Sequence, residues 1–247
     1  MFLLSKPAIL SCLAMIPLSM AFSVQAQTYA SGFTDAKWSA QSGAFACSLT
    51  HEIPAFGTAY FGQNAGLDFN SGVPVALTNG QLVTDEGCAT ISNSSGQLLF
   101  YTDGVTIWNR SGGIMSNGTG ILGYQNNTSP ALIVKVPKSK STYYLFTTSL
   151  QNGLRYSIIN MNGDNGLGNV IQKNIQLNSA SLGRITVAYH ANGVDIWVLV
   201  HYNDSRNYEA FLVTELGIQL PGVISQGVLL HTSDHGDMII SPDGKKV

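Results

Sequence analysis

The sequence has few charged residues and no long apolar run after its first residues. Lys, Arg, Asp and Glu make up only 11% of the 247 residues, and the formal net charge is −2. The one basic group, Lys135, Lys138 and Lys140, flanks Pro137 in a predicted hairpin turn, so we expect no nucleic-acid partner. Beyond residue 26 the longest purely apolar run covers residues 196–200. A membrane span needs about 20 such residues, so none is expected after signal cleavage.

Motifs that carry catalysis or bind cofactors are also missing. No GxSxG, HExxH or phosphate-binding glycine pattern occurs, and no CxxC or Cys/His cluster indicates zinc. The densest polar run, HTSDHGD, contains His231, Asp234, His235 and Asp237, which are residue types that ligate metals or transfer protons. The run falls where one predicted blade connects to the next, which favours a solvated loop. We therefore predict no catalytic residue, no metal and no cofactor, and a protein that is not an enzyme.

The first residues have the layout of a secretory signal. Lys6 precedes an apolar stretch over residues 8–22, and the triplet Val24, Gln25, Ala26 ends in a small residue. This predicts a signal peptide over residues 1–26 and an exported chain that begins at Gln27. Cys12 lies in the signal, and the residues before it fit the lipid-attachment pattern poorly.

Only Cys47 and Cys88 remain in the predicted mature chain. An oxidising compartment outside the cytoplasm permits them to form a disulfide. The alternative is that Cys88, at the apolar start of a predicted strand, is a small buried residue. Spacing alone does not decide between the two, because a disulfide requires a specific geometry.

A repeated hairpin follows. Strands rich in β-branched and aromatic residues flank tight turns at residues 94–96, 137–141, 192–193 and 242–244. The hairpins begin at Ala89, Ala131, Ile185 and Met238, at spacings of 42, 54 and 53 residues, near the roughly 40–50 residues of propeller blades. The sequence therefore predicts an all-β fold: an incomplete β-propeller of four-stranded antiparallel blades, preceded by a short β-rich N-terminal segment. Three blades and the start of a fourth, truncated at Val247, are expected over residues 61–247.

Two resemblances accompany this pattern. Residues 61–247 resemble the propeller segments of large surface proteins from gliding bacteria, often attached to PKD-type modules, through FGQNAGLDFNSG, GQLLFYTDGVTIWN, YHANGVDIWVLVH and ISPDGKKV. Residues 36–61 resemble the start of MotY, a periplasmic protein of the sodium-driven flagellar motor, through Trp38, Cys47, His51 and Pro54. The second resemblance implies a MotY-like segment over residues 27–60.

Strand order gives the candidate binding residues. In a meander, the connections between second and third strands lie at one end, together with the connections between blades, and these loops are the longer and more polar ones. Binding residues concentrate in such loops on a rigid scaffold. The face predicted to bind a ligand contains Asp103, Asn152, His201, Asp204, Arg206 and His235.

Three functions remain open. The first is an exported, non-enzymatic binding or scaffolding propeller at the cell surface or outside the cell, with an unknown protein or glycan as partner. The second is a periplasmic, MotY-like structural component of the flagellar motor. The third is a fragment of a glycan-active hydrolase whose catalytic residues lie in further blades.

Overall fold

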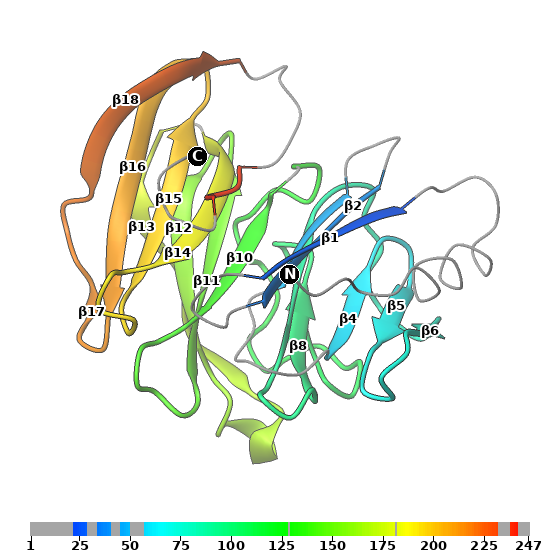
Figure 1. The fold of residues 1–247 in the computed structure, drawn as a ribbon. Coiled ribbons are helices and arrows are strands. Elements are labelled where there is room, and N and C mark those ends of the chain that lie inside the picture. The colour runs from blue at the N-terminus through cyan, green and yellow to red at the C-terminus, as the bar shows by residue number, and fades with distance from the viewer. Residues whose placement is uncertain are drawn as a thin grey trace.

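The fold is built from strands arranged in four sheets (Figure 1). The computed structural model describes residues 22–28, 34–40, 45–49, 57–127, 129–180, 182–231 and 238–241. Within these ranges, the helical structure consists of one 3-10 turn, Asp164–Gly166. This agrees with the predicted all-β class. None of the described residues forms a helix long and apolar enough to cross a membrane.

Sheet 1 and sheet 2 contain the first half of the chain. Sheet 1 has three strands, β4 (Thr58–Phe61), β5 (Ala65–Asp68) and β6 (Val75–Leu77). Sheet 2 has six strands in the order β1-β2-β3-β7-β8-β9. Its strands are β1 (Phe22–Thr28), β2 (Thr34–Ala40), β3 (Phe45–Leu49), β7 (Cys88–Ser92), β8 (Leu98–Thr102) and β9 (Ile107–Asn109).

Sheet 3 and sheet 4 contain the second half. Sheet 3 is a four-stranded meander of β10 (Ala131–Lys135), β11 (Thr142–Ser149), β12 (Gly153–Asn160) and β13 (Asn169–Asn178). Sheet 4 has five strands, β14 (Leu182–Tyr189), β15 (Ile196–Tyr202), β16 (Ser205–Thr214), β17 (Gly217–Ile218) and β18 (Val223–Leu230). Both β17 and β18 pair with β16.

The first three predicted hairpins are confirmed. β7 and β8, β10 and β11, and β14 and β15 pair antiparallel on either side of the expected turns. Gly96 and Gly193 have positive φ values of 80° and 70° in two of these turns, a conformation that glycine adopts without a steric cost. The fourth turn, at residues 242–244, lies outside the described residues.

Sheet 2 differs from the expected first blade. The sequence predicts a four-stranded meander that starts at Ala89, with the MotY-like segment as a separate preceding unit. Instead, β3 pairs in parallel with β7, so that β1, β2 and β3 join the same sheet as the first hairpin. Residues 50–87 connect these two strands and contain sheet 1. A parallel pairing over such a connection has no local turn signal, which is why the sequence did not reveal it.

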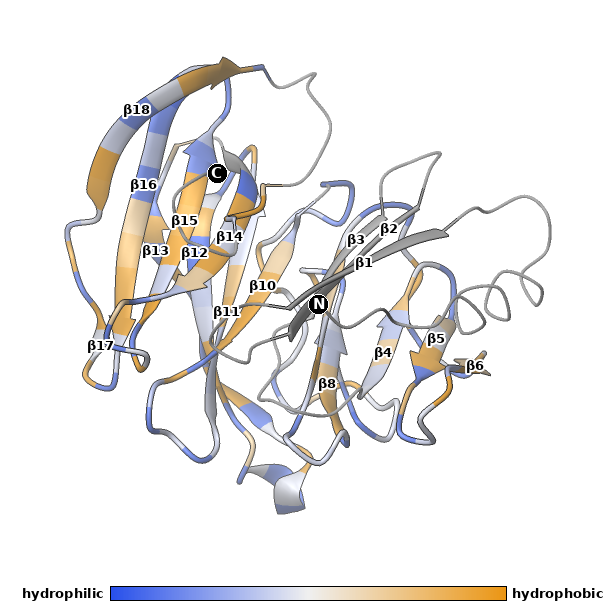
Figure 2. Ribbon diagram, viewed as in Figure 1, coloured by the Kyte–Doolittle hydropathy of each residue, from blue (hydrophilic) through white to orange (hydrophobic). Residues whose placement is uncertain are grey.

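The four sheets pack face to face in the order of their numbers. One apolar cluster contains Tyr60 of sheet 1 and Leu98 and Tyr101 of sheet 2. A second joins sheet 2 to sheet 3 through Phe100, Ile107 and Leu145, and a third joins sheet 3 to sheet 4 through Phe146, Val198 and Phe211. Figure 2 shows the apolar residues concentrated along β10, β15 and β16. Each junction between neighbouring sheets is therefore an apolar layer.

Sheet 3 shows why the sheets stack. Successive side chains of a strand point to opposite faces of its sheet. In β10, Ala131 and Ile133 belong to the layer against sheet 2, whereas Leu132 and Val134 belong to the layer against sheet 4. β11 repeats the pattern with Tyr143 and Leu145 on one side and Tyr144 and Phe146 on the other. With two apolar faces, sheet 3 is stable only when it is covered on both sides.

We predict that Phe146→Ala destabilises the chain by about 3–5 kcal/mol, because Phe146 is fully buried between sheet 3 and sheet 4 and its removal leaves a cavity. Urea unfolding followed by tryptophan fluorescence measures the loss. The matched control is Ile171→Ala in β13 of the same sheet, whose side chain is 51% exposed and should cost under about 1 kcal/mol. Equal losses from the two variants would contradict the packing of sheet 3 on sheet 4.

Candidate functional site

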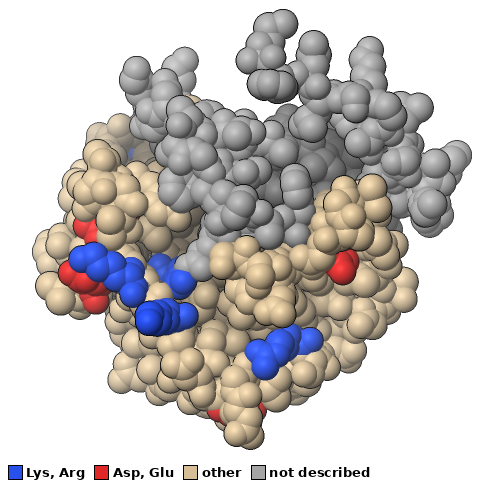
Figure 3. Space-filling model, turned by 60° about the horizontal axis from the view of Figure 1, so that its bottom comes forward, with Lys and Arg blue, Asp and Glu red and all other residues tan. Residues whose placement is uncertain are grey.

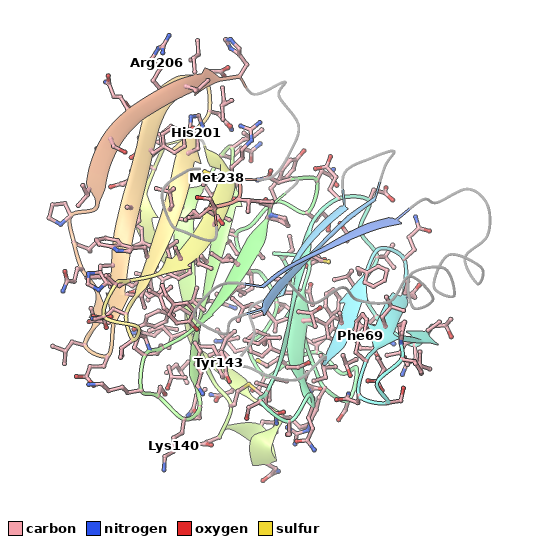
Figure 4. The ribbon with its side chains drawn as sticks, in the orientation of Figure 1. Phe69, Lys140, Tyr143, His201, Arg206 and Met238 are labelled. Atoms are coloured by element: carbon pink, nitrogen blue, oxygen red, sulfur yellow. The ribbon has the colours of Figure 1, made fainter. Side chains whose placement is uncertain are left out.

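The residues predicted to bind a ligand lie toward one end of the stack. Figure 4 places His201 and Arg206 at the end opposite Lys140, as the strand order predicts. Figure 3 shows a few Lys and Arg side chains, some beside Asp or Glu, among mostly uncharged residues. The predicted residues at the other end lie in different surroundings.

Asp103 holds a turn rather than offering a free carboxylate. It lies between β8 and β9, its side chain is only 6% exposed, and its Oδ1 accepts hydrogen bonds from the backbone N–H groups of Val105 (2.8 Å) and Thr106 (2.7 Å). Gly104, with φ of 88°, completes the turn. The carboxylate compensates for two N–H groups that the turn would otherwise leave unpaired. The expectation that Asp103 is an accessible loop residue is wrong.

Asn152 also stabilises its own connection. It is half-buried between β11 and β12, where the Oγ of Ser149 accepts hydrogen bonds from the backbone N–H groups of Gln151 and Asn152, at 3.2 Å each. The backbone carbonyl of Asn152 accepts a hydrogen bond from Nε of Arg155 (3.2 Å). These bonds fix the tip of the hairpin. The side-chain Nδ2 of Asn152 also donates a hydrogen bond to Oγ of Ser149 (3.4 Å).

Asp204, Arg206 and His231 form the exposed polar cluster of this end, which we call the Asp204 cluster. Asp204 occupies the turn between β15 and β16 with φ of 50°, and its Oδ1 lies 3.4 Å from Nδ1 of His231. Both side chains are 58% exposed. Arg206 lies near the start of β16, and its Nη1 donates a hydrogen bond to the carbonyl of Gly227 (3.4 Å). The cluster brings one carboxylate, one guanidinium and one imidazole to the surface.

Asp204 and Arg206 were predicted to bind a ligand, whereas His231 was not. His231 belongs to the HTSDHGD run, but the structure pairs it with Asp204, which is distant in the sequence. His235 of the same run lies outside the described residues. Among the residues that the structure describes, no group of three or more His, Cys, Asp or Glu side chains is placed to hold a metal ion.

His201 is not in a loop. It lies in β15, it is fully buried, and its ring packs edge-on against Tyr208 with centroids 4.4 Å apart. Neither ring nitrogen has a hydrogen-bond partner of good geometry. Burial lowers the pKa of His201, and this outweighs the opposing effect of the Val228 backbone; the nearby charge of Arg184 lowers the pKa further, against a smaller opposing effect from the backbone of Ser205. His201 therefore lies in the core, in β15, rather than in the predicted connection.

A buried carboxylate that the sequence did not reveal links sheet 3 to sheet 4. Glu209 of β16 is only 6% exposed. Its Oε2 accepts hydrogen bonds from Tyr202 Oη (2.6 Å) and from Nδ2 of Asn178 in β13 (2.6 Å). Burial raises the pKa of Tyr202, and so do the hydrogen bond to Glu209 and its negative charge. Tyr202 therefore stays protonated and continues to donate to the carboxylate.

The aromatic residues of the strands mainly fill the core. Tyr101, Tyr144, Phe146 and Phe211 are buried, as expected for packing between sheets rather than for carbohydrate stacking. Trp108 is partly buried and stacks on Tyr101, with centroids 5.6 Å apart and an interplanar angle of 17°. The two cysteines occupy opposite register positions of β3 and β7.

One comparison with known proteins gives a match. The family model described as the MotY N-terminal domain matches residues 29–97. It supports the resemblance seen over residues 36–61 and extends it through sheet 1 and β7. No curated protein and no solved structure matches the chain. The resemblance to propeller segments of gliding-type surface proteins thus receives no support from the comparisons.

We predict that the buried His201 makes the stability of the chain depend on pH. Its pKa in the folded state is below the value of about 6.5 in the unfolded chain, so the unfolded state binds more protons as the pH falls. The stability that the lowered pKa of His201 gives to the folded state is fully present above about pH 6.5. It is lost as the pH falls toward the lowered pKa of the folded state. Thermal melts of the wild type and His201→Phe between pH 8 and pH 5 measure it.

The expected result is that the melting temperature of the wild type falls more steeply on acidification than that of His201→Phe, which cannot be protonated at this position. His190→Phe is the matched control, because His190 is a partly exposed histidine of the same sheet's β14–β15 turn. A parallel decline of wild type and His201→Phe would show that His201 does not titrate as a buried group.

Proposed function

We propose that the chain is an exported, non-enzymatic binding or scaffolding module of the cell envelope that contacts its partner through the end carrying the Asp204 cluster. The observation that carries the proposal is the MotY N-terminal domain match over residues 29–97, because MotY is a periplasmic protein. This match favours the periplasm over the cell surface. The signal peptide predicted over residues 1–26, whose cleavage would remove residues 22–26 of β1, supports the same compartment.

The arrangement of the sheets supports a propeller as the scaffold. Sheets 1 to 4 pack face to face, and sheet 3 is a four-stranded meander as in a blade. The first strands of the three predicted hairpins also lie side by side, β7 beside β10 and β10 beside β14, as the inner strands of blades do around an axis. Such a scaffold presents the connections at each end as rigid loops, which suits binding.

The Asp204 cluster is the best candidate contact at this end. Asp103 and Asn152 are engaged in their own turns and His201 is buried, so their side chains have little to offer a partner. Asp204, Arg206 and His231 are exposed and present both signs of charge. Exposed charges at an interface steer association and improve specificity more than they raise affinity.

A structural role in the flagellar motor is the second candidate, and the same family match favours it. The stretch that carries the match includes β2, β3 and all of sheet 1. This role makes the partner a protein of the motor's periplasmic part rather than a glycan. Unlike the general proposal, this role requires the chain to bind to purified basal bodies, which can be tested.

We predict that the double variant Asp204→Asn with Arg206→Gln binds a partner at this end at least about tenfold more weakly than the wild type, with little loss of stability. Asparagine suits position 204 because its positive φ is tolerated by asparagine better than by alanine. The probe is purified basal bodies from a bacterium with a sodium-driven motor, and co-sedimentation of the chain measures binding.

Lys140→Gln is the matched control, because Lys140 lies at the opposite end of the stack. The motor role predicts co-sedimentation of the wild type and of this control, with loss in the double variant. Equal loss in both variants would refute the assignment of the binding end. Absence of the wild type from both the sediment and the osmotic-shock fraction of a Gram-negative host would refute the motor role and the periplasmic location together.

A further inference from the structure

The junction between β3 and β7 is a short one within sheet 2. Among the strands that the structure describes, these two form the only parallel pair, and they share three register positions: Cys47 with Cys88, Ser48 with Ala89, and Leu49 with Thr90. Parallel pairing is slightly less stable per residue than antiparallel pairing. Through these three positions β1, β2 and β3 are attached to the rest of their sheet. Because this junction is so short, a covalent link between β3 and β7 would stabilise it.

The two cysteines stand opposite each other at one end of this junction. Neighbouring strands of a sheet lie about 4.7–4.9 Å apart, and disulfides form where Cα atoms are about 4.4–6.8 Å apart. The register of Cys47 and Cys88 therefore gives a backbone separation that a disulfide can bridge. In the predicted mature chain these are the two cysteines present, so no third thiol competes.

The surroundings of Cys88 tolerate the loss of its thiol proton. Cys88 is buried beside Tyr60, Leu82 and Leu98, and its Sγ lies 3.6 Å from the backbone carbonyl of Tyr60. That carbonyl also accepts a hydrogen bond from the hydroxyl of Thr90 (3.0 Å). When Cys88 loses its thiol proton on oxidation, the carbonyl of Tyr60 still accepts the stronger hydrogen bond from Thr90. Oxidation therefore leaves no buried acceptor unpaired.

We propose that Cys47 and Cys88 form a disulfide that fastens β3 to β7. The inference rests on the export proposed above, because a reducing cytoplasm keeps thiols reduced. One thiolate attacks an external disulfide, either a protein disulfide or glutathione disulfide, and releases one thiol while a mixed disulfide forms. The second thiolate then displaces the other thiol. The two cysteines lose two protons and two electrons, and the external disulfide gains them as two thiols.

The bond lies within the stretch that matches the MotY N-terminal domain and joins its β3 to its β7. It closes a loop that contains all of sheet 1, and a cross-link over such a loop restricts the unfolded chain. Because Cys88 is 1% exposed, the bond forms before β7 is buried and is then shielded from reductants. The folded protein should therefore resist mild reduction unless denaturant is present.

Peptide mapping tests the link directly. Cleavage after Lys37, Glu52, Glu86 and Arg110 separates the cysteines into peptides 38–52 and 87–110. The protein is alkylated in the osmotic-shock fraction, digested without reductant and analysed by mass spectrometry. The expected result is one linked species that reductant splits into the two peptides. Two separately alkylated peptides, or a link from either cysteine to a peptide that contains Cys12, would overturn the proposal.

A second sample separates this proposal from that of export. Reduced protein from the cytoplasm is refolded with glutathione disulfide and mapped in the same way. A 38–52/87–110 link in this sample supports the pairing even where the protein is missing from the osmotic-shock fraction, and that missing protein then counts against export alone. No link in either sample overturns the pairing.

The thermal stability of variants provides an independent readout. Complete reduction under denaturant followed by refolding should lower the wild-type melting temperature by several degrees and leave that of Cys47→Ala unchanged. Cys47→Ala, Cys88→Ala and the double variant should lose similar amounts, since removal of either cysteine breaks the same bond. Additive losses from the two single variants would contradict a bond between them.

Discussion

The structure depends on one constraint, which is that its central sheets are apolar on both faces. Alternate residues of β10 and β11 enter two different apolar layers, so sheet 3 exposes apolar surface to water unless a sheet covers each side. Sheet 2 meets the same requirement with Phe100 facing sheet 3 and Tyr101 facing sheet 1. Face-to-face stacking of consecutive sheets satisfies the requirement at every internal junction. From β4 onward the order of the stack follows the order of the chain, whereas β1, β2 and β3 join sheet 2.

Stacking also determines where function can lie. With the faces of the sheets engaged in packing, polar side chains are left to the connections and to the outer strands. Several connections use their polar groups internally, as the carboxylate of Asp103 and the hydroxyl of Ser149 do. Polar contacts between sheets add specificity to the apolar layers, and Glu209 with Asn178 is the clearest case. The exposed charges that remain, including the Asp204 cluster, are the groups available to a partner.

Local signals in the sequence predicted local structure well. Turns with Gly96 and Gly193 set the first and third hairpins, and the alternation of apolar residues predicted their strands. The parallel pairing of β3 with β7 could not be predicted, because no turn residue marks contacts between distant strands. The burial of Glu209 was missed for a related reason, since its partner Asn178 belongs to another sheet. His201 was assigned to a connection because β15 extends further than its apolar run.

The most direct test of the stacked arrangement is a double-mutant cycle between Asn178 in β13 and Glu209 in β16. Their side chains meet across the junction of sheet 3 and sheet 4, with Nδ2 and Oε2 2.6 Å apart. Urea unfolding of the wild type, Asn178→Ala, Glu209→Ala and the double variant gives the coupling energy. The stacked arrangement predicts coupling of about 1.5–3 kcal/mol, as for a hydrogen bond to a charged group. Losses that add to within about 0.5 kcal/mol would contradict it.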